Sequence, residues 1–205
     1  MSRLSTQKAR LIAYLGEHGI GRSRDLIAVG ITATTIARAK TNGIIEHISR
    51  GLYQLPNRDV GINTAIAEIS KRHPKAVICL VSALAYYGLT DQIPRKVWIA
   101  IDNKAWEPKS TYPRIRVVRF RGRYYSEGIV RENMSQVSVP IYTLEKSIAD
   151  AFRNPKLVDR SVAIESLKTA LAEQKSTPSK LAQAAKTFGA WNKMRPYLEA
   201  LTSNG

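Results

Sequence analysis

Residues 23–55 read SRDLIAVGITATTIARAKTNGIIEHISRGLYQL, and this stretch decides the fold of the N-terminal part of the chain. Ser23 predicts the start of a short helix, because a serine hydroxyl can accept a hydrogen bond from a free N–H of the first turn. Asp25 suits the positive end of that helix dipole. Gly30 favours a left-handed residue that ends the helix and starts a tight turn.

A second helix is predicted directly after this turn. Thr32 or Thr34 can cap its start, and the helix runs to about Asn42, where Gly43 tolerates a positive φ. A period of 3.6 residues places Ile36, Ala39 and Gly43 on one small or apolar side. The opposite side is polar and consists of Thr34, Thr35, Arg38, Thr41 and Asn42.

Two short strands follow, at residues 44–48 and 52–55, around a Ser49-Arg50-Gly51 turn. Two helices joined at a glycine and followed by a hairpin are typical of a winged helix-turn-helix, whose second helix enters the major groove of DNA. The same pattern also fits a small α+β domain with a solvated polar face. The DNA-reading interpretation assigns base or phosphate contacts to Ser23, Arg24, Thr34, Thr35, Arg38, Lys40, Thr41, Asn42 and, at the tip of the wing, Arg50.

The charge of the chain favours a polyanionic partner. Its 205 residues include 32 lysines and arginines against 16 acids, which gives a formal net charge of +16. Double-stranded nucleic acid is the expected partner. An anionic membrane surface is less favoured, because the chain has no apolar run of transmembrane length and no signal-peptide pattern.

The residues that could carry other chemistry are few. Cys79 lies in the apolar run AVICLV and is expected to be a small buried hydrophobe. Three scattered histidines offer no metal-ligand spacing, so we expect neither a metal nor a cofactor. We therefore predict a cytoplasmic DNA-binding protein that is not an enzyme and has no small-molecule ligand.

The length of the chain allows two domains. The polar segment 56–61, with its proline and glycine, marks the boundary, so we predict a winged helix-turn-helix domain at 1–58 and a second domain at 62–205. A support helix is expected at residues 4–18. The second domain is predicted as α+β, with strands at 97–101 and 115–120, a strand or helix approach at 76–81, and helices at 63–72, 83–87 (capped by Ser82), 142–152 (capped by Thr143), 158–175, 181–188 and 191–201.

The second predicted strand lies in the most basic part of the sequence. Its arginines are interleaved with Phe120, Tyr124 and Tyr125, a composition found in nucleic-acid grooves, where guanidinium groups pair with phosphates and rings stack on bases. An exposed edge strand protected by charge explains the pattern equally well. The candidates for additional nucleic-acid or partner contacts are Arg114, Arg116, Arg119, Arg121 and Arg123, with Arg131 nearby.

Several motifs along nearly the whole chain resemble the AbiEi-type antitoxins of bacterial type IV toxin–antitoxin (abortive infection) systems. The N-terminal part of the resemblance includes Gly30-Ile31-Thr32, Ile36, Arg38, Gly43 and residues 49–53 (SRGLY). The more specific motifs are Ser82-Ala83-Leu84, residues 87–89 (YGL), Pro94 with 97–101 (VWIAI), 139–150 (VPIYTLEKSIAD) and 194–201 (MRPYLEAL).

This resemblance implies a phage-defence protein with two domains. The N-terminal winged helix would repress its own operon by binding repeats in the promoter. The C-terminal antitoxin domain would counteract a neighbouring nucleotidyltransferase-like toxin. The sequence departs from the family pattern at Ala33, Ala37 and Ala39, where bulkier or more basic residues often stand. Fewer base contacts from this helix would leave more of the affinity to Arg50 and the backbone.

The sequence also contains residues that fit two other functions. Asp102 followed by Glu107-Pro108-Lys109 loosely imitates a metal-dependent nuclease pattern, but Pro108 disfavours the strand that the pattern needs. Glu145 and Asp150 are five residues apart on a predicted helix, so a shared site is not expected. A one-component repressor could instead sense a small ligand through a pocket lined by Tyr86, Tyr87, Trp98 and Trp106, although core packing is the commoner use of aromatic residues.

Overall fold

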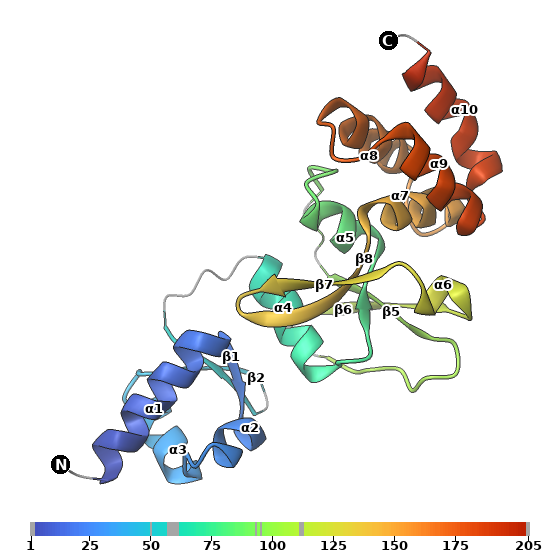
Figure 1. The fold of residues 1–205 in the computed structure, drawn as a ribbon. Helices are drawn as coiled ribbons and strands as arrows, with labels where there is room; N and C mark the ends of the chain where they lie inside the picture. The colour runs from blue at the N-terminus through green and yellow to red at the C-terminus, as the bar shows by residue number, and fades with distance from the viewer. Residues whose placement is uncertain are drawn as a thin grey trace. The chain divides into compact units, whose positions relative to one another are not determined.

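A computed structural model describes residues 3–49, 51–56, 62–92, 94, 96–110 and 113–203. In this part of the chain the fold is α+β, with helices and two small sheets (Figure 1). The chain divides into two compact units. The first consists of residues 1–72 with 132–139, and the second of residues 73–131 with 140–205.

The first unit begins with three helices and a small antiparallel sheet. Its strands are in the order β1-β3-β2, so β1 pairs with β3 although β2 lies between them in the sequence. The core is formed by Leu11 and Leu15 of α1 packed with Leu26, Ile36 and Ile45. The elements are α1 (Arg3–His18), β1 (Ile20–Arg22), α2 (Ser23–Ala28), α3 (Ala33–Thr41), β2 (Glu46–Ser49), β3 (Leu52–Gln54) and α4 (Ile62–Arg72).

Helix α4 belongs to the first unit, whereas the sequence placed residues 62–72 in the second domain. The reason is a pair of contacts that the sequence does not reveal. The amino group of Lys71 donates a hydrogen bond to the carbonyl of Ile20 and lies 5.9 Å from the centre of the Tyr14 ring. The predicted linker itself lies largely outside the described residues.

The second unit is built on a five-stranded sheet with the order β6-β5-β4-β8-β7. Strands β5 and β6 are parallel, with Val97 opposite Ile115 and Asp102 opposite Phe120. The elements are β4 (Val77–Ile78), α5 (Leu80–Tyr86), β5 (Val97–Asp102), β6 (Ile115–Phe120), α6 (Arg123–Ser126), β7 (Ile129–Met134), β8 (Val137–Tyr142), α7 (Leu144–Arg153), α8 (Arg160–Ala172), α9 (Pro178–Thr187) and α10 (Trp191–Thr202). The tip of the β7–β8 hairpin is the part assigned to the first unit.

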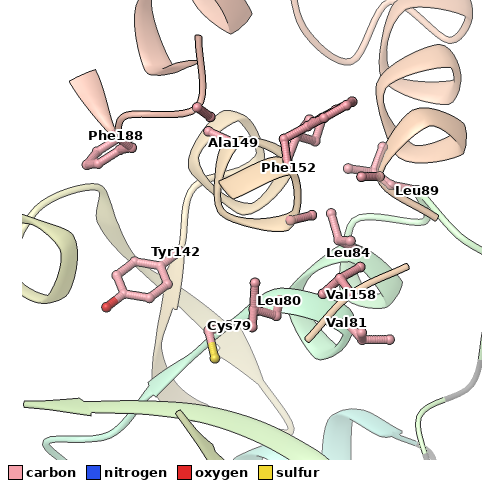
Figure 2. Packing of buried hydrophobic residues seen from close by; sticks show 14 of the residues in the cluster. Cys79, Leu80, Val81, Leu84, Leu89, Tyr142, Ala149, Phe152, Val158 and Phe188 are labelled. Atoms are coloured by element: carbon pink, nitrogen blue, oxygen red, sulfur yellow. The ribbon is translucent and has the colours of Figure 1, made fainter. Parts of the chain in front are cut away.

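Helix α7 is at the centre of the second unit. It packs against α5, α8, α9 and α10, which gather around it in Figure 1. Figure 2 shows its Ala149 and Phe152 in the same cluster as Leu80 and Leu84 of α5. Because α7 is covered on several sides, its interior positions are almost all buried, including polar ones.

Capping signals predicted some helix ends in this unit and failed at others. Thr143 caps α7 as predicted, since its hydroxyl accepts a hydrogen bond from the N–H of Lys146 at 3.3 Å. The prediction that Ser82 caps a helix is wrong, because α5 begins at Leu80 and the Ser82 hydroxyl accepts a hydrogen bond from the N–H of Trp98. The β7–β8 hairpin was not predicted. Glycine or asparagine at positive φ is the usual signal of such a turn, whereas the residues at positive φ here are Ser135 and Gln136.

The single cysteine of the chain lies in an apolar environment. Cys79 is fully buried in the core of the second unit, as predicted, and burial raises the pKa of its thiol. No helix in the described ranges combines the length and the apolar character that crossing a bilayer requires.

Candidate nucleic-acid interface

The turn between α2 and α3 forms as the sequence predicts. Gly30 has a φ of +84°, and its N–H donates a hydrogen bond to the carbonyl of Ile27. The N–H of Ile31 donates to the carbonyl of Leu26 at 3.0 Å, which satisfies the last turn of α2. Ile31 is buried, so the turn holds both helices against one core.

Of the two predicted caps for α3, Thr32 is the one that the structure uses. Its hydroxyl accepts a hydrogen bond from the N–H of Thr35 at 3.3 Å. The same hydroxyl donates to Oε1 of Gln7 on α1 at 3.0 Å. The cap therefore also joins α3 to α1.

Thr35 does not lie on the exposed face of α3 where the helical period placed it. Its side chain is buried, and its hydroxyl donates to Oε1 of Gln7 at 2.6 Å. The hydroxyl of Thr32 lies 2.9 Å away. Thr35 thus connects α3 to α1 and is not available to a base edge unless the helix moves. The period failed because α1 covers one flank of α3, a contact between residues far apart in sequence.

The remaining predicted residues of α3 and of its C-terminal end are all exposed. Arg38 and Lys40 are exposed and make no ion pair with another described residue, so both charges face solvent. The hydroxyl of Thr41 donates to the carbonyl of Ala37 at 3.1 Å. The exposed predicted contacts are Thr34, Arg38, Lys40, Thr41 and Asn42.

The start of α2 is arranged differently from the prediction. Arg22, not Ser23, is the N-cap residue of α2. The N–H of Ser23 donates to the carbonyl of Gly51 at 2.8 Å, and its hydroxyl donates to the same carbonyl at 3.4 Å. Ser23 therefore fixes the β2–β3 turn against α2. Arg24 is exposed and pairs with Asp25 at 3.3 Å, which reduces its availability to a phosphate.

Strands β2 and β3 pair as an antiparallel hairpin, as the sequence predicted. Ser49 is paired with Leu52, and Gly51 has a φ of +74°. Arg50, the predicted tip residue, lies outside the described residues. An additional strand, β1, pairs with β3 and was not predicted, because Ile20-Gly21-Arg22 is too short to show a periodic pattern.

The arginine-rich strand is the edge of the five-stranded sheet, as one of the two interpretations expected. Its arginines do not form one open patch. The Arg116 guanidinium lies 4.1 Å from the centre of the Trp98 ring, and Arg119 donates to the carbonyls of Asn103 and Ala105. Arg131 is on β7, at the opposite end of the sheet order.

The aromatic residues near this strand all make contacts within the protein. Phe120 is buried, and its ring lies 6.1 Å from the Tyr142 ring. The hydroxyl of Tyr125 donates to the carbonyl of Lys75, and the Tyr124 ring covers the Arg153 guanidinium at 4.1 Å. Rings that the sequence interpretation assigned to base stacking are therefore also used in the packing of the second unit.

The residues of the two alternative functions are also scattered. Oδ1 of Asp102 accepts a hydrogen bond from the N–H of Lys104, and Glu107 pairs with Arg119. Trp98 is buried whereas Trp106 is 98% exposed, so these residues do not line a common pocket. In the described ranges, no three histidine, cysteine or acidic side chains are grouped closely enough to hold a metal.

Comparison with known proteins supports the fold. A crystal structure of the RV2827C protein from Mycobacterium tuberculosis is similar to this chain, with a TM-score of 0.60 over 97% of this chain and 81% of that chain. The identity is 12%, so the similarity concerns the fold alone. No protein-family model matches the sequence, and no curated protein matches it.

A buried ionic group in α7 was missed by sequence reasoning. The Lys146 amino group donates to Asp150 at 2.7 Å and to the carbonyl of Tyr124 at 2.9 Å. The other carboxylate oxygen of Asp150 accepts a hydrogen bond from Arg153 at 2.7 Å. The side chains of Lys146 and Asp150 are fully buried, and burial lowers the pKa of Lys146 while Asp150 opposes that shift. In the sequence, the signal for this group is the spacing of Lys146, Asp150 and Arg153, which stand at positions i, i+4 and i+7 of one helix.

Proposed function

We propose that this protein is the antitoxin of a type IV toxin–antitoxin system and represses its own operon by binding repeats in the promoter. In this proposal, residues 3–54 act as a winged helix-turn-helix, with α3 as the reading helix and the β2–β3 hairpin as the wing. The second unit counteracts a nucleotidyltransferase-like toxin.

The observation that carries the DNA-binding part is the exposed face of α3. The helical period places the unpaired charge of Arg38 on the same side as the polar groups of Thr34, Thr41 and Asn42, and Lys40 is exposed about 160° around the helix from Arg38. A guanidinium can bind a guanine edge with two hydrogen bonds, and hydroxyl and amide groups can bind bases or phosphates. The net charge of +16 adds attraction toward a polyanion that does not depend on sequence.

The antitoxin part rests on the motifs that resemble the AbiEi-type family. One of them, residues 139–150, supplies the end of β8 and most of α7, around which the second unit is packed. A function of this unit against a toxin therefore depends on the integrity of α7.

We expect Arg38→Ala to weaken binding to the promoter upstream of the gene by about 1–3 kcal/mol. It should also reduce the preference for that promoter over a random duplex, because a lost base contact affects only the specific complex. Fluorescence anisotropy with both duplexes at fixed salt measures the two affinities.

Arg160→Ala is the matched control for Arg38→Ala. Arg160 is exposed at the start of α8 in the second unit and carries the same charge. Its replacement should leave the preference between the two duplexes unchanged. An equal loss on both duplexes for Arg38→Ala would make Arg38 a phosphate contact and remove α3 as the reader.

The antitoxin role can be tested with full-length variants in cells that express the adjacent nucleotidyltransferase-like gene. We expect Arg38→Ala to protect as well as the natural protein, because its change is confined to the first unit. Asp150→Asn, which disturbs the core of the second unit, should lose protection. Full protection by an Asp150→Asn protein whose second unit is shown to be unfolded would refute the role assigned to that unit.

A further inference from the structure

The second unit contains an open cleft of about 590 Å³, lined in part by two of the arginines that the sequence offered as additional contacts. It lies where β6 ends, beside α6 and the end of α7. Its volume is in the range of small-molecule sites, roughly 300–1,000 Å³. The residues that define its character are Val117, Arg119, Phe120, Arg121, Tyr124 and Arg153.

The cleft is rich in positive charge that the protein itself only partly neutralises. The side chain of Arg121 is exposed and makes no ion pair or hydrogen bond with another described residue. Arg153 shares the single carboxylate of Asp150 with Lys146, so two cations compete for one anion. An anionic ligand in the cleft would therefore relieve an electrostatic imbalance inside the unit.

The Arg153 guanidinium is held in position before any ligand arrives. Its central carbon lies 4.1 Å from the centre of the Tyr124 ring and 4.9 Å from the centre of the Phe120 ring. Its bond to Asp150 fixes one edge of the group. A fixed planar guanidinium loses little entropy when it binds an oxyanion with two hydrogen bonds.

Arg119 has a different use at the same cleft. It donates to the carbonyls of Asn103 and Ala105 and pairs with Glu107, so it anchors the loop between β5 and β6. The neighbouring residue in that loop, Trp106, is 98% exposed. The loop therefore exposes a large aromatic ring to solvent directly before Glu107, which lines the cleft.

The walls between these charges are apolar. Val117, Phe120 and Leu157 line the cleft together with the arginines. A ligand that matches both parts has an anionic group at one end and a flat or apolar group at the other. An inorganic anion would use only the arginines, and an uncharged aromatic molecule only the walls.

We infer that this cleft binds a nucleoside phosphate, with the phosphate on Arg121 and Arg153 and the base against the apolar wall. The shared chemistry is a phosphate monoester on the sugar of a nucleoside, supplied either by a free mononucleotide or by the terminal nucleotide of a strand. The inference does not depend on the proposed DNA-reading role of α3, which belongs to the other unit.

Isothermal titration calorimetry of the full-length protein with AMP, UMP, adenosine and inorganic phosphate tests the inference at low and moderate salt. We expect a mononucleotide to bind at least about tenfold more tightly than adenosine, because its phosphate adds charged hydrogen bonds to the arginines that adenosine cannot make. Arg121→Gln should weaken that binding by about tenfold or more. In a second set of titrations, a short single-stranded oligonucleotide with a terminal phosphate replaces AMP. If only the oligonucleotide binds, and Arg121→Gln weakens its binding by the same factor, the natural ligand is the phosphorylated end of a strand and not a free mononucleotide.

Arg114→Gln is the matched control, because Arg114 is an exposed arginine directly before the same strand and is not among the residues that line the cleft. Its replacement should leave the affinity unchanged. Equal losses in Arg114→Gln and Arg121→Gln would show diffuse attraction and overturn the inference. Tighter binding of a glutamate-rich hexapeptide than of any nucleotide probe would also overturn it and identify an acidic peptide as the ligand.

Discussion

Asp150→Asn is expected to destabilise the second unit by about 3–5 kcal/mol, the typical loss when one partner of a buried ionic group is removed. The carboxylate of Asp150 accepts hydrogen bonds from both Lys146 and Arg153. An asparagine in its place leaves a fully buried amino group without its counter-ion. Burial already lowers the pKa of Lys146, and the loss of the carboxylate removes the interaction that opposes this shift.

Chemical denaturation followed by tryptophan fluorescence measures this loss. All three tryptophans, Trp98, Trp106 and Trp191, belong to the second unit, so the signal does not report on the first. We expect a shift of the transition to lower denaturant concentration with little change in its slope.

Lys146→Met is the comparison that separates charge from packing. The long apolar side chain of methionine keeps contacts with the Tyr142 and Phe188 rings, whose centres lie 4.0 and 4.4 Å from the lysine amino group. Asp150 still pairs with Arg153 in this variant. We therefore expect a loss below about 2 kcal/mol, since replacing a buried charge by an apolar group can be nearly neutral. Equal losses in the two variants would contradict the assignment of Asp150 as the shared counter-ion.

Gly128→Ala is expected to destabilise the second unit by about 2–5 kcal/mol. Gly128 has a φ of +68°, where a side chain costs about 1–2 kcal/mol. A Cβ there would lie 2.5 Å from Cδ of Lys146 and 3.1 Å from Cζ of Phe188. Lys146 cannot easily move aside, because its amino group is bound to Asp150 and Tyr124, so crowding adds about 1–3 kcal/mol.

Gly122→Ala is the matched control for this variant. Gly122 also lies in the second unit and has a φ of +52°, but a Cβ there would meet no atom within 4 Å. It should lose only a backbone cost of about 1–3 kcal/mol, because a φ of +52° with a ψ of −137° is a conformation that side chains other than glycine rarely adopt. The same tryptophan-monitored denaturation measures both variants. If the two losses match, the space around Lys146 is looser than these contacts imply.

The sequence alone determined the elements whose signals are local. Gly30 and Gly43 end α2 and α3 at positive φ, and the caps of α3 and α7 are threonines that bond to an N–H three residues later. Such interactions involve neighbours in the chain, so residue types at fixed spacing are enough to predict them. The exposed charges of Arg38 and Lys40 were predictable for the same reason.

Only the tertiary structure decided which polar residues remain exposed and which become buried. Thr35 is buried because Gln7, on α1, lies against it, and Arg116 and Arg119 are occupied by Trp98 and the loop before their strand. Lys146 and Asp150 are buried because α5, α8, α9 and α10 surround α7. These contacts join residues far apart in sequence, and a helical or strand period records only which side of one element a residue occupies, not what covers that side.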